Sequence, residues 1–181
     1  MLKKFFKNSK NHIQEDLNPE EQHKLDERKC RKESTSRITE ALLPFAHSSH
    51  INELAEIMNY RLDVLTQDIS ELQLYIASIE NLDAPDESDF RKDNAHRIKL
   101  SLIYFAHDEE RREKLSLFLK YDADTLKTDI DNLDFYIQEM ENQKLEYQIR
   151  KTARKNHEDE DEAVKKYWKE QFEALKRKYG A

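Results

Sequence analysis

Two stretches of the chain carry apolar residues at alternating steps of four and three positions, the heptad spacing of helices that pack along one stripe. Each stripe covers about three heptads, so each predicts a long helix that needs a facing helix. The positions are Met58, Leu62, Leu65, Ile69, Leu72, Ile76 and Ile79 in the first stretch, and Leu119, Ala123, Leu126, Ile130, Leu133, Ile137 and Met140 in the second.

The residues around the two stripes recur in the same order. A block from Arg37 to His47 is repeated from Arg97 to His107, and a block from Tyr60 to Asn81 is repeated from Tyr121 to Asn142. Two heptad helices resemble each other without common origin, and that is the alternative explanation. The shared Phe-Ala-His and the closing Glu-Asn lie outside the heptad pattern, so the sequence favours a tandem duplication.

Each repeat predicts a short helix, a tight turn and a long helix. The short helices are expected to begin near Ser36 and Ser88 and to end near His47 and His107. Ser48 or Ser49 begins the first long helix, and Asp108 begins the second. We expect the two long helices to pack against each other in a four-helix bundle with the short helices outside. The alternative is a homodimer in which the stripes pair between two chains. Pro44 is expected to kink or shorten the first short helix.

We therefore expect an all-α fold, with the duplicated short-helix and long-helix hairpin forming an antiparallel or coiled-coil-like bundle between additional N- and C-terminal helices. The predicted segments are a basic, flexible tail (1–17), a polar helix that begins at Asn18-Pro19 (18–33), the first repeat (34–82), a linker containing Pro85 (83–87), the second repeat (88–142) and a charged helical extension with an amphipathic aromatic end (143–181).

The composition argues against most enzyme classes. The chain of 181 residues has one glycine, Gly180, whereas phosphate-binding loops, dinucleotide motifs and nucleophile elbows all require glycine at defined places. Cys30 is the single cysteine, so no intrachain disulfide and no thiolate zinc cluster can form. We expect no catalysis and no cofactor. Because no apolar run reaches membrane-spanning length and the basic start lacks a signal-peptide core, we expect a cytoplasmic protein.

Charge is unevenly distributed along the chain. Residues 34–142 hold 11 Lys and Arg against 23 Asp and Glu, and the segments on either side are net basic. The acidic middle argues against nucleic-acid binding and fits a protein that covers a basic partner, as an immunity protein or nucleic-acid mimic does. Five acids, 158–162, follow the basic run Arg150–Lys155 and offset its field. Residues 1–10 carry four lysines and no acid, so contact with an anionic membrane surface is a further hypothesis.

Several side chains recur at matched places and are candidates for chemistry. His47 and His107 could form a metal or small-ligand site, and capping of a helix C-terminus is the simpler interpretation, so we predict no metal site. The remaining recurring residues are predicted to be solvated acids beside the stripes or packing aromatics: Asp63, Asp68, Asp124 and Asp129, and Tyr60, Tyr75, Tyr121 and Tyr136.

The last helix predicts one aromatic face. Its residues, at steps of four, four, three and four, are Val164, Trp168, Phe172, Leu175 and Tyr179. Trp168, Phe172, Leu175 and Tyr179 are our candidates for binding a protein partner, because aromatic residues dominate such contacts. The alternative is that this face docks onto the chain's own bundle. Together these features favour a non-enzymatic interaction protein, such as an adaptor, scaffold or inhibitor.

Overall fold

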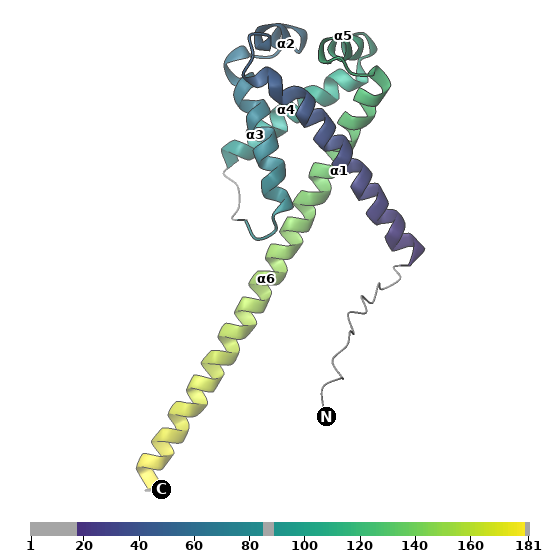
Figure 1. Cartoon of the computed structure of the whole chain (residues 1–181). Coiled ribbons are helices and arrows are strands. Elements are labelled where there is room, and N and C mark those ends of the chain that lie inside the picture. Colours follow the sequence, from purple (N-terminus) through teal and green to yellow (C-terminus); the bar gives the residue numbers. More distant parts are fainter. Residues whose placement is uncertain (1–17, 85–88, 180–181) are drawn as a thin grey trace, which may run out of the picture.

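A computed structural model of the chain describes residues 18–84 and 89–179, except the side chains of Asp89, Leu175, Lys178 and Tyr179. Over these residues the fold is all-α, as predicted, and none of the described helices is both long and apolar enough to cross a membrane (Figure 1). The helices are α1 (Pro19–Ala46), α2 (Ile51–Ile57), α3 (Leu62–Glu80), α4 (Asp89–His107), α5 (Glu109–Leu119) and α6 (Ala123–Tyr179).

Helix α1 joins two predicted helices into one. It begins with a capping box, in which the Asn18 side chain accepts a hydrogen bond from the Glu21 amide at 2.9 Å and Glu21 accepts one from the Asn18 amide at 3.2 Å. The expected helix start near Ser36 is wrong. No glycine or proline interrupts the chain there, and Ser34 and Thr35 are buried against the bundle instead of capping a helix. The other expected start, Ser88, lies outside the described residues. Pro44 lies in the last turn of α1.

The predicted long helices are each interrupted near their start. Helix α2 ends before Asn59, and α5 ends before Lys120; both residues have positive φ, 45° and 54°. In each case the amide of the residue after the positive-φ position donates a hydrogen bond back to the helix at 2.8 Å, from Tyr60 to the Ala55 carbonyl and from Tyr121 to the Ser116 carbonyl. This is the Schellman arrangement that ends many helices. The expectation of one helix from Ser48 or Ser49 to Asn81 is therefore wrong.

Lys120 supplies a direct test of this interruption. The Cβ of a lysine in the left-handed region is sterically strained, whereas glycine has no Cβ. Lys120→Gly should therefore stabilise the fold by about 0.5–1 kcal/mol. Lys120→Val should destabilise it, because a branched Cβ fits this conformation least well. Urea unfolding monitored by circular dichroism would measure both changes. A loss of stability in the glycine variant would contradict the positive φ at this position.

Helix α6 also joins two predicted elements. The stripe of the second repeat and the charged extension form one continuous helix, because no glycine or proline occurs between Ala123 and Tyr179. Figure 1 shows its C-terminal half leaving the bundle as a single projecting helix, while the N-terminal half of α1 diverges on another side.

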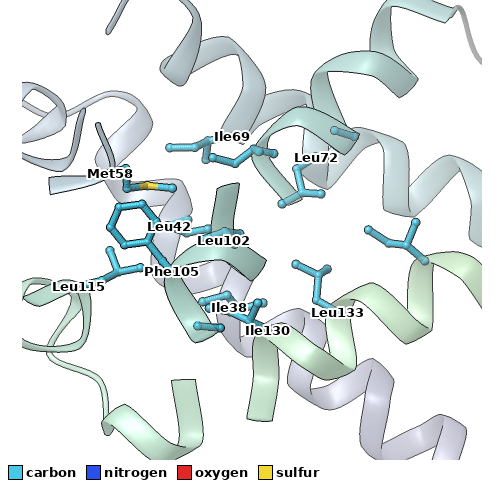
Figure 2. Close-up of a cluster of buried hydrophobic side chains, with 14 of the residues drawn as sticks. Ile38, Leu42, Met58, Ile69, Leu72, Leu102, Phe105, Leu115, Ile130 and Leu133 are labelled. Carbon is cyan, nitrogen blue, oxygen red and sulfur yellow. The ribbon is translucent and has the colours of Figure 1, made fainter. Parts of the chain in front are cut away.

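Most residues of the two stripes are buried within one chain, although Leu62 is 46% exposed and Ile76 and Ala123 are only partly buried. The most extensive contacts join α1 to α6 and α3 to α4, so each stripe packs mainly on the first helix of the other half. The expectation that the two stripes pack mainly on each other is therefore wrong. Figure 2 shows the resulting core. Its fully buried residues include matched positions from both halves, namely Ile38 and Ile98, Leu42 and Leu102, Leu54 and Leu115, and Leu65 and Leu126.

Candidate functional site

Two of the recurring aspartates lie in buried polar clusters. Asp68 and Asp129 are fully buried, so the prediction that they are solvated is wrong for both. Asp129 accepts hydrogen bonds from Arg37 Nε at 2.9 Å and from Nη2 at 2.6 Å, and Tyr121 donates a third. Ser34 lies in the same cluster, where its hydroxyl accepts from Arg37 at 3.0 Å. A bidentate arginine is a strong partner for a carboxylate.

The other half of the molecule repeats this cluster. Asp68 accepts hydrogen bonds from Arg97 Nε at 2.6 Å and Nη2 at 2.7 Å, and from the Tyr60 hydroxyl. Asn94 takes the place of Ser34 and accepts from Arg97. The arginine of each half thus pairs with the aspartate of the other half, and the two contacts are reciprocal.

The electrostatics of the first cluster follow from these contacts. Burial alone would raise the pKa of Asp129, but hydrogen bonds from Arg37, Tyr121 and Ser34 outweigh it and lower the pKa below its ordinary value. Burial and the neighbouring carboxylate raise the pKa of Tyr121 to about 12. The aspartate is thus held ionised and the phenol protonated, so neither group is poised to exchange protons near neutral pH.

A second pair of contacts crosses between the halves in the same way. The Tyr75 hydroxyl donates to Glu141, which also lies 2.8 Å from His96 Nε2. The matching Tyr136 hydroxyl donates to Glu80, whose carboxylate pairs with Lys32 at 3.1 Å. Like the aspartate clusters, these contacts join the two halves, but their carboxylates are only partly buried. They are best explained as the polar part of the core.

The duplicated histidines do not converge with other ligands. His107 lies 3.1 Å from an Asp131 carboxylate oxygen, and His47 is exposed just after the last residue of α1. Among the residues that the structure describes, no group of three or more His, Cys, Asp or Glu side chains is arranged to hold a metal ion.

The projecting part of α6 is the candidate interaction site. Among the described side chains of this helix Lys144 is the last that is buried, and its ammonium donates to the Ser78 carbonyl at 3.3 Å. Tyr147 and Lys151 then bind Asp83, at 2.7 and 2.9 Å, and tie the end of the first half to α6. Beyond this point every described side chain from Ile149 to Ala174 is exposed.

The predicted aromatic face lies on this projecting segment. Val164, Trp168 and Phe172 are 54%, 66% and 59% exposed, so the alternative in which they dock on the chain's own bundle is wrong. The Trp168 ring packs edge-on against Tyr167 at 5.8 Å, and the Lys176 ammonium lies 5.1 Å from the centre of the Phe172 ring. The candidate side chains of Leu175 and Tyr179, and residues 1–10, lie outside what the structure describes.

Sequence reasoning missed other exposed apolar residues on α6. Phe135, Leu145, Ile149 and Tyr167 are each more than half exposed, although the heptad pattern gave no reason to single them out. Leu145 and Ile149 lie one turn apart, but Phe135 and Tyr167 are ten and eighteen positions from the nearest of them, so no regular apolar spacing marks the four residues. The projecting helix therefore exposes apolar groups along more than one face.

Comparison with known proteins identifies no similar protein. No protein-family model matches the chain, and neither the curated proteins nor the solved structures include one significantly similar to it.

Proposed function

We propose that this chain is a non-enzymatic interaction protein, an adaptor or scaffold in which a folded helical head presents α6 to a protein partner. The observation that carries the proposal is the run of exposed side chains from Ile149 to Ala174, which includes Trp168 and Phe172. Contiguous apolar groups on a soluble surface favour association, because covering them removes apolar area from water.

The head supports this role by fixing the base of the helix. Residues of α6 up to Lys144 are packed into the core, and the Asp83 contacts anchor the next turn. An isolated helix of this length and charge is only marginally stable in water, so continuity with the packed half favours helix formation in the projecting half. Trp168 and Phe172, one turn apart, then share a face that a groove on a partner can accept.

The proposal includes an origin by tandem duplication and a cytoplasmic location. The reciprocal Arg37–Asp129 and Arg97–Asp68 contacts support the duplication, because matched residues of both halves occupy matched environments. The helix ends at Asn59 and Lys120 support it as well. Cys30 as the single cysteine fits a reducing compartment.

The test compares partner capture by the full chain and by a Trp168→Glu plus Phe172→Glu variant. A buried aromatic hot spot contributes about 2 kcal/mol or more, so we expect captured partners to fall more than tenfold. Proteins from lysate of the source organism, treated with nuclease, would be quantified by mass spectrometry. The matched control is Lys166→Gln plus Arg177→Gln, which changes net charge equally on the opposite face of the same helix. Equal capture by both variants would rule out the aromatic face as the binding surface.

A further inference from the structure

A second exposed stripe runs along the projecting helix beside the aromatic face. Leu145, Ile149 and Tyr167 are 57%, 60% and 56% exposed and mark its two ends. The positions between them follow helical spacing, with steps of three or four residues. In order, the stripe is Leu145, Ile149, Ala153, Asn156, Glu160, Ala163 and Tyr167. Its ends are apolar and its centre is polar.

Charge on the same segment is divided into two blocks of opposite sign. Residues 150–155 contain four basic side chains and no acid, and residues 158–162 are five consecutive acids. The boundary between the blocks falls at Asn156 and His157, the middle of the exposed stripe. In a parallel, in-register pair of such helices each block would face its own sign. In an antiparallel pair centred on this boundary, each block faces the opposite sign.

We propose that two copies of this chain pair antiparallel along α6, with the twofold axis close to Asn156. The inference rests on the proposed function, since it takes the projecting helix as the binding surface, and it names a second copy as an occupant. Flanking charges on one side then pair Arg150 with Asp161 and Glu146 with Lys165 of the second copy. On the other side Lys155 faces Asp159 of the second copy.

The apolar ends of the stripe match in the same register. Leu145 meets Tyr167 of the second copy, and Ile149 meets Ala163, so each apolar end is covered by the other chain's apolar end. Asn156 lies on the axis, where it meets its own counterpart. A single asparagine in a helix pair fixes register at a cost in stability. With polar groups at its centre, the pair relies on its charges, so its affinity should depend strongly on salt.

Competing contacts within one chain are weak. Arg150 lies 3.4 Å from Glu146 and His157 lies 3.7 Å from Asp161, both one turn apart on the exposed helix. Pairs of this kind contribute little in water. The paired stretch from Leu145 to Tyr167 is about 33 Å long at ~1.5 Å per residue. Trp168 and Phe172 lie just beyond the end of this stretch and are not part of the stripe.

The first test is the mass of the purified full chain in solution. Sedimentation velocity should show a monomer–dimer equilibrium whose dissociation constant rises at least tenfold between about 0.05 and about 0.5 M salt. Arg150→Glu plus Lys155→Glu should yield a monomer, and so should Asp159→Lys plus Asp161→Lys. Combining all four substitutions, or mixing the two double variants, should restore the dimer. Lys114→Glu in α5, on the head, is the control and should change nothing. A monomeric wild type, or no restoration, would overturn the inference.

Orientation is tested by cysteine cross-linking in a Cys30→Ser background. Under oxidation Asn156→Cys should form a disulfide-linked dimer, whereas Leu145→Cys should not, because antiparallel pairing holds the two copies of that position far apart. Cross-linking at both positions would indicate a parallel pair and sink the proposal. The outcomes also separate the two proposals: a monomer that still captures partners through Trp168 retains the adaptor role alone. A dimer that captures nothing retains self-pairing alone.

Discussion

Replacing Arg37 by methionine should lower the free energy of unfolding by about 1–3 kcal/mol at neutral pH, because it leaves the buried Asp129 carboxylate without its bidentate partner, while water partly screens the half-exposed arginine. Asp129 would stay buried, with the Tyr121 and Ser34 hydroxyls as its remaining hydrogen-bond donors. Methionine keeps most of the side-chain volume, so the loss reports the charge and its hydrogen bonds rather than a cavity. Chemical denaturation followed by circular dichroism at pH 7 would measure it.

The same variant should show a changed pH dependence. In the wild type the pKa of Asp129 is lowered, so its contribution to stability is present above the unfolded-state pKa and is lost as pH falls through the folded-state pKa. Without Arg37, burial dominates and raises that pKa, so folding instead favours the protonated acid. The wild type then loses stability on acidification where the variant gains it. The difference between them should shrink steadily from pH 7 to about pH 3.

Two controls separate this effect from general damage. Adding Asp129→Asn to Arg37→Met removes the orphaned charge and should recover part of the loss. Lys114→Met breaks an exposed pair with Glu110, whose atoms lie 2.6 Å apart, and should cost less than about 0.5 kcal/mol. A loss of similar size at pH 7 and pH 3 would show that Asp129 ionisation is not its cause.

The sequence predicted the helical class and the stripes, because heptad spacing depends only on local periodicity. It did not predict where the helices stop. The ends at Asn59 and Lys120 use left-handed residues other than glycine; asparagine is a known but less frequent choice for that conformation, and lysine gives no signal for it. The start near Ser36 failed for the opposite reason, since serine is a good cap in isolation, whereas Ser34 and Thr35 are used for packing.

The buried clusters show what a single sequence leaves open. Asp68 and Asp129 each lie next in sequence to a stripe residue, a place where burial depends on which helix covers that side. Their arginine partners recur at matched positions, Arg37 and Arg97, and this recurrence was the available signal. The exposed position of Trp168 was equally open. An amphipathic face predicts that something covers it, and only the continuous course of α6 away from the head shows that the bundle does not.

Replacing Leu126 by alanine should lower the free energy of unfolding by about 2–5 kcal/mol, the usual range for a buried leucine that leaves a cavity. Leu126 is fully buried near the start of α6, and Leu65 is its fully buried counterpart in α3. If the two halves pack equivalently, Leu65→Ala should lower the free energy of unfolding by a similar amount, and the difference between the two variants should be smaller than either loss. Leu100→Ala on the exposed side of α4, where the leucine is 62% exposed, is the matched control and should cost under about 0.5 kcal/mol.

Unfolding measurements on these variants also test whether the projecting part of α6 unfolds together with the head. Leu126 packs the half of α6 that anchors the projection, so Leu126→Ala should weaken partner capture only in proportion to the fraction of unfolded protein. Unfolding followed separately by far-ultraviolet circular dichroism and by Trp168 fluorescence tests this, since that tryptophan lies on the projecting segment. Coincident transitions would mean that head and projection unfold as one unit. A fluorescence transition that precedes the loss of the head would instead mean that the projecting half melts on its own, and the core then fixes only the base of α6.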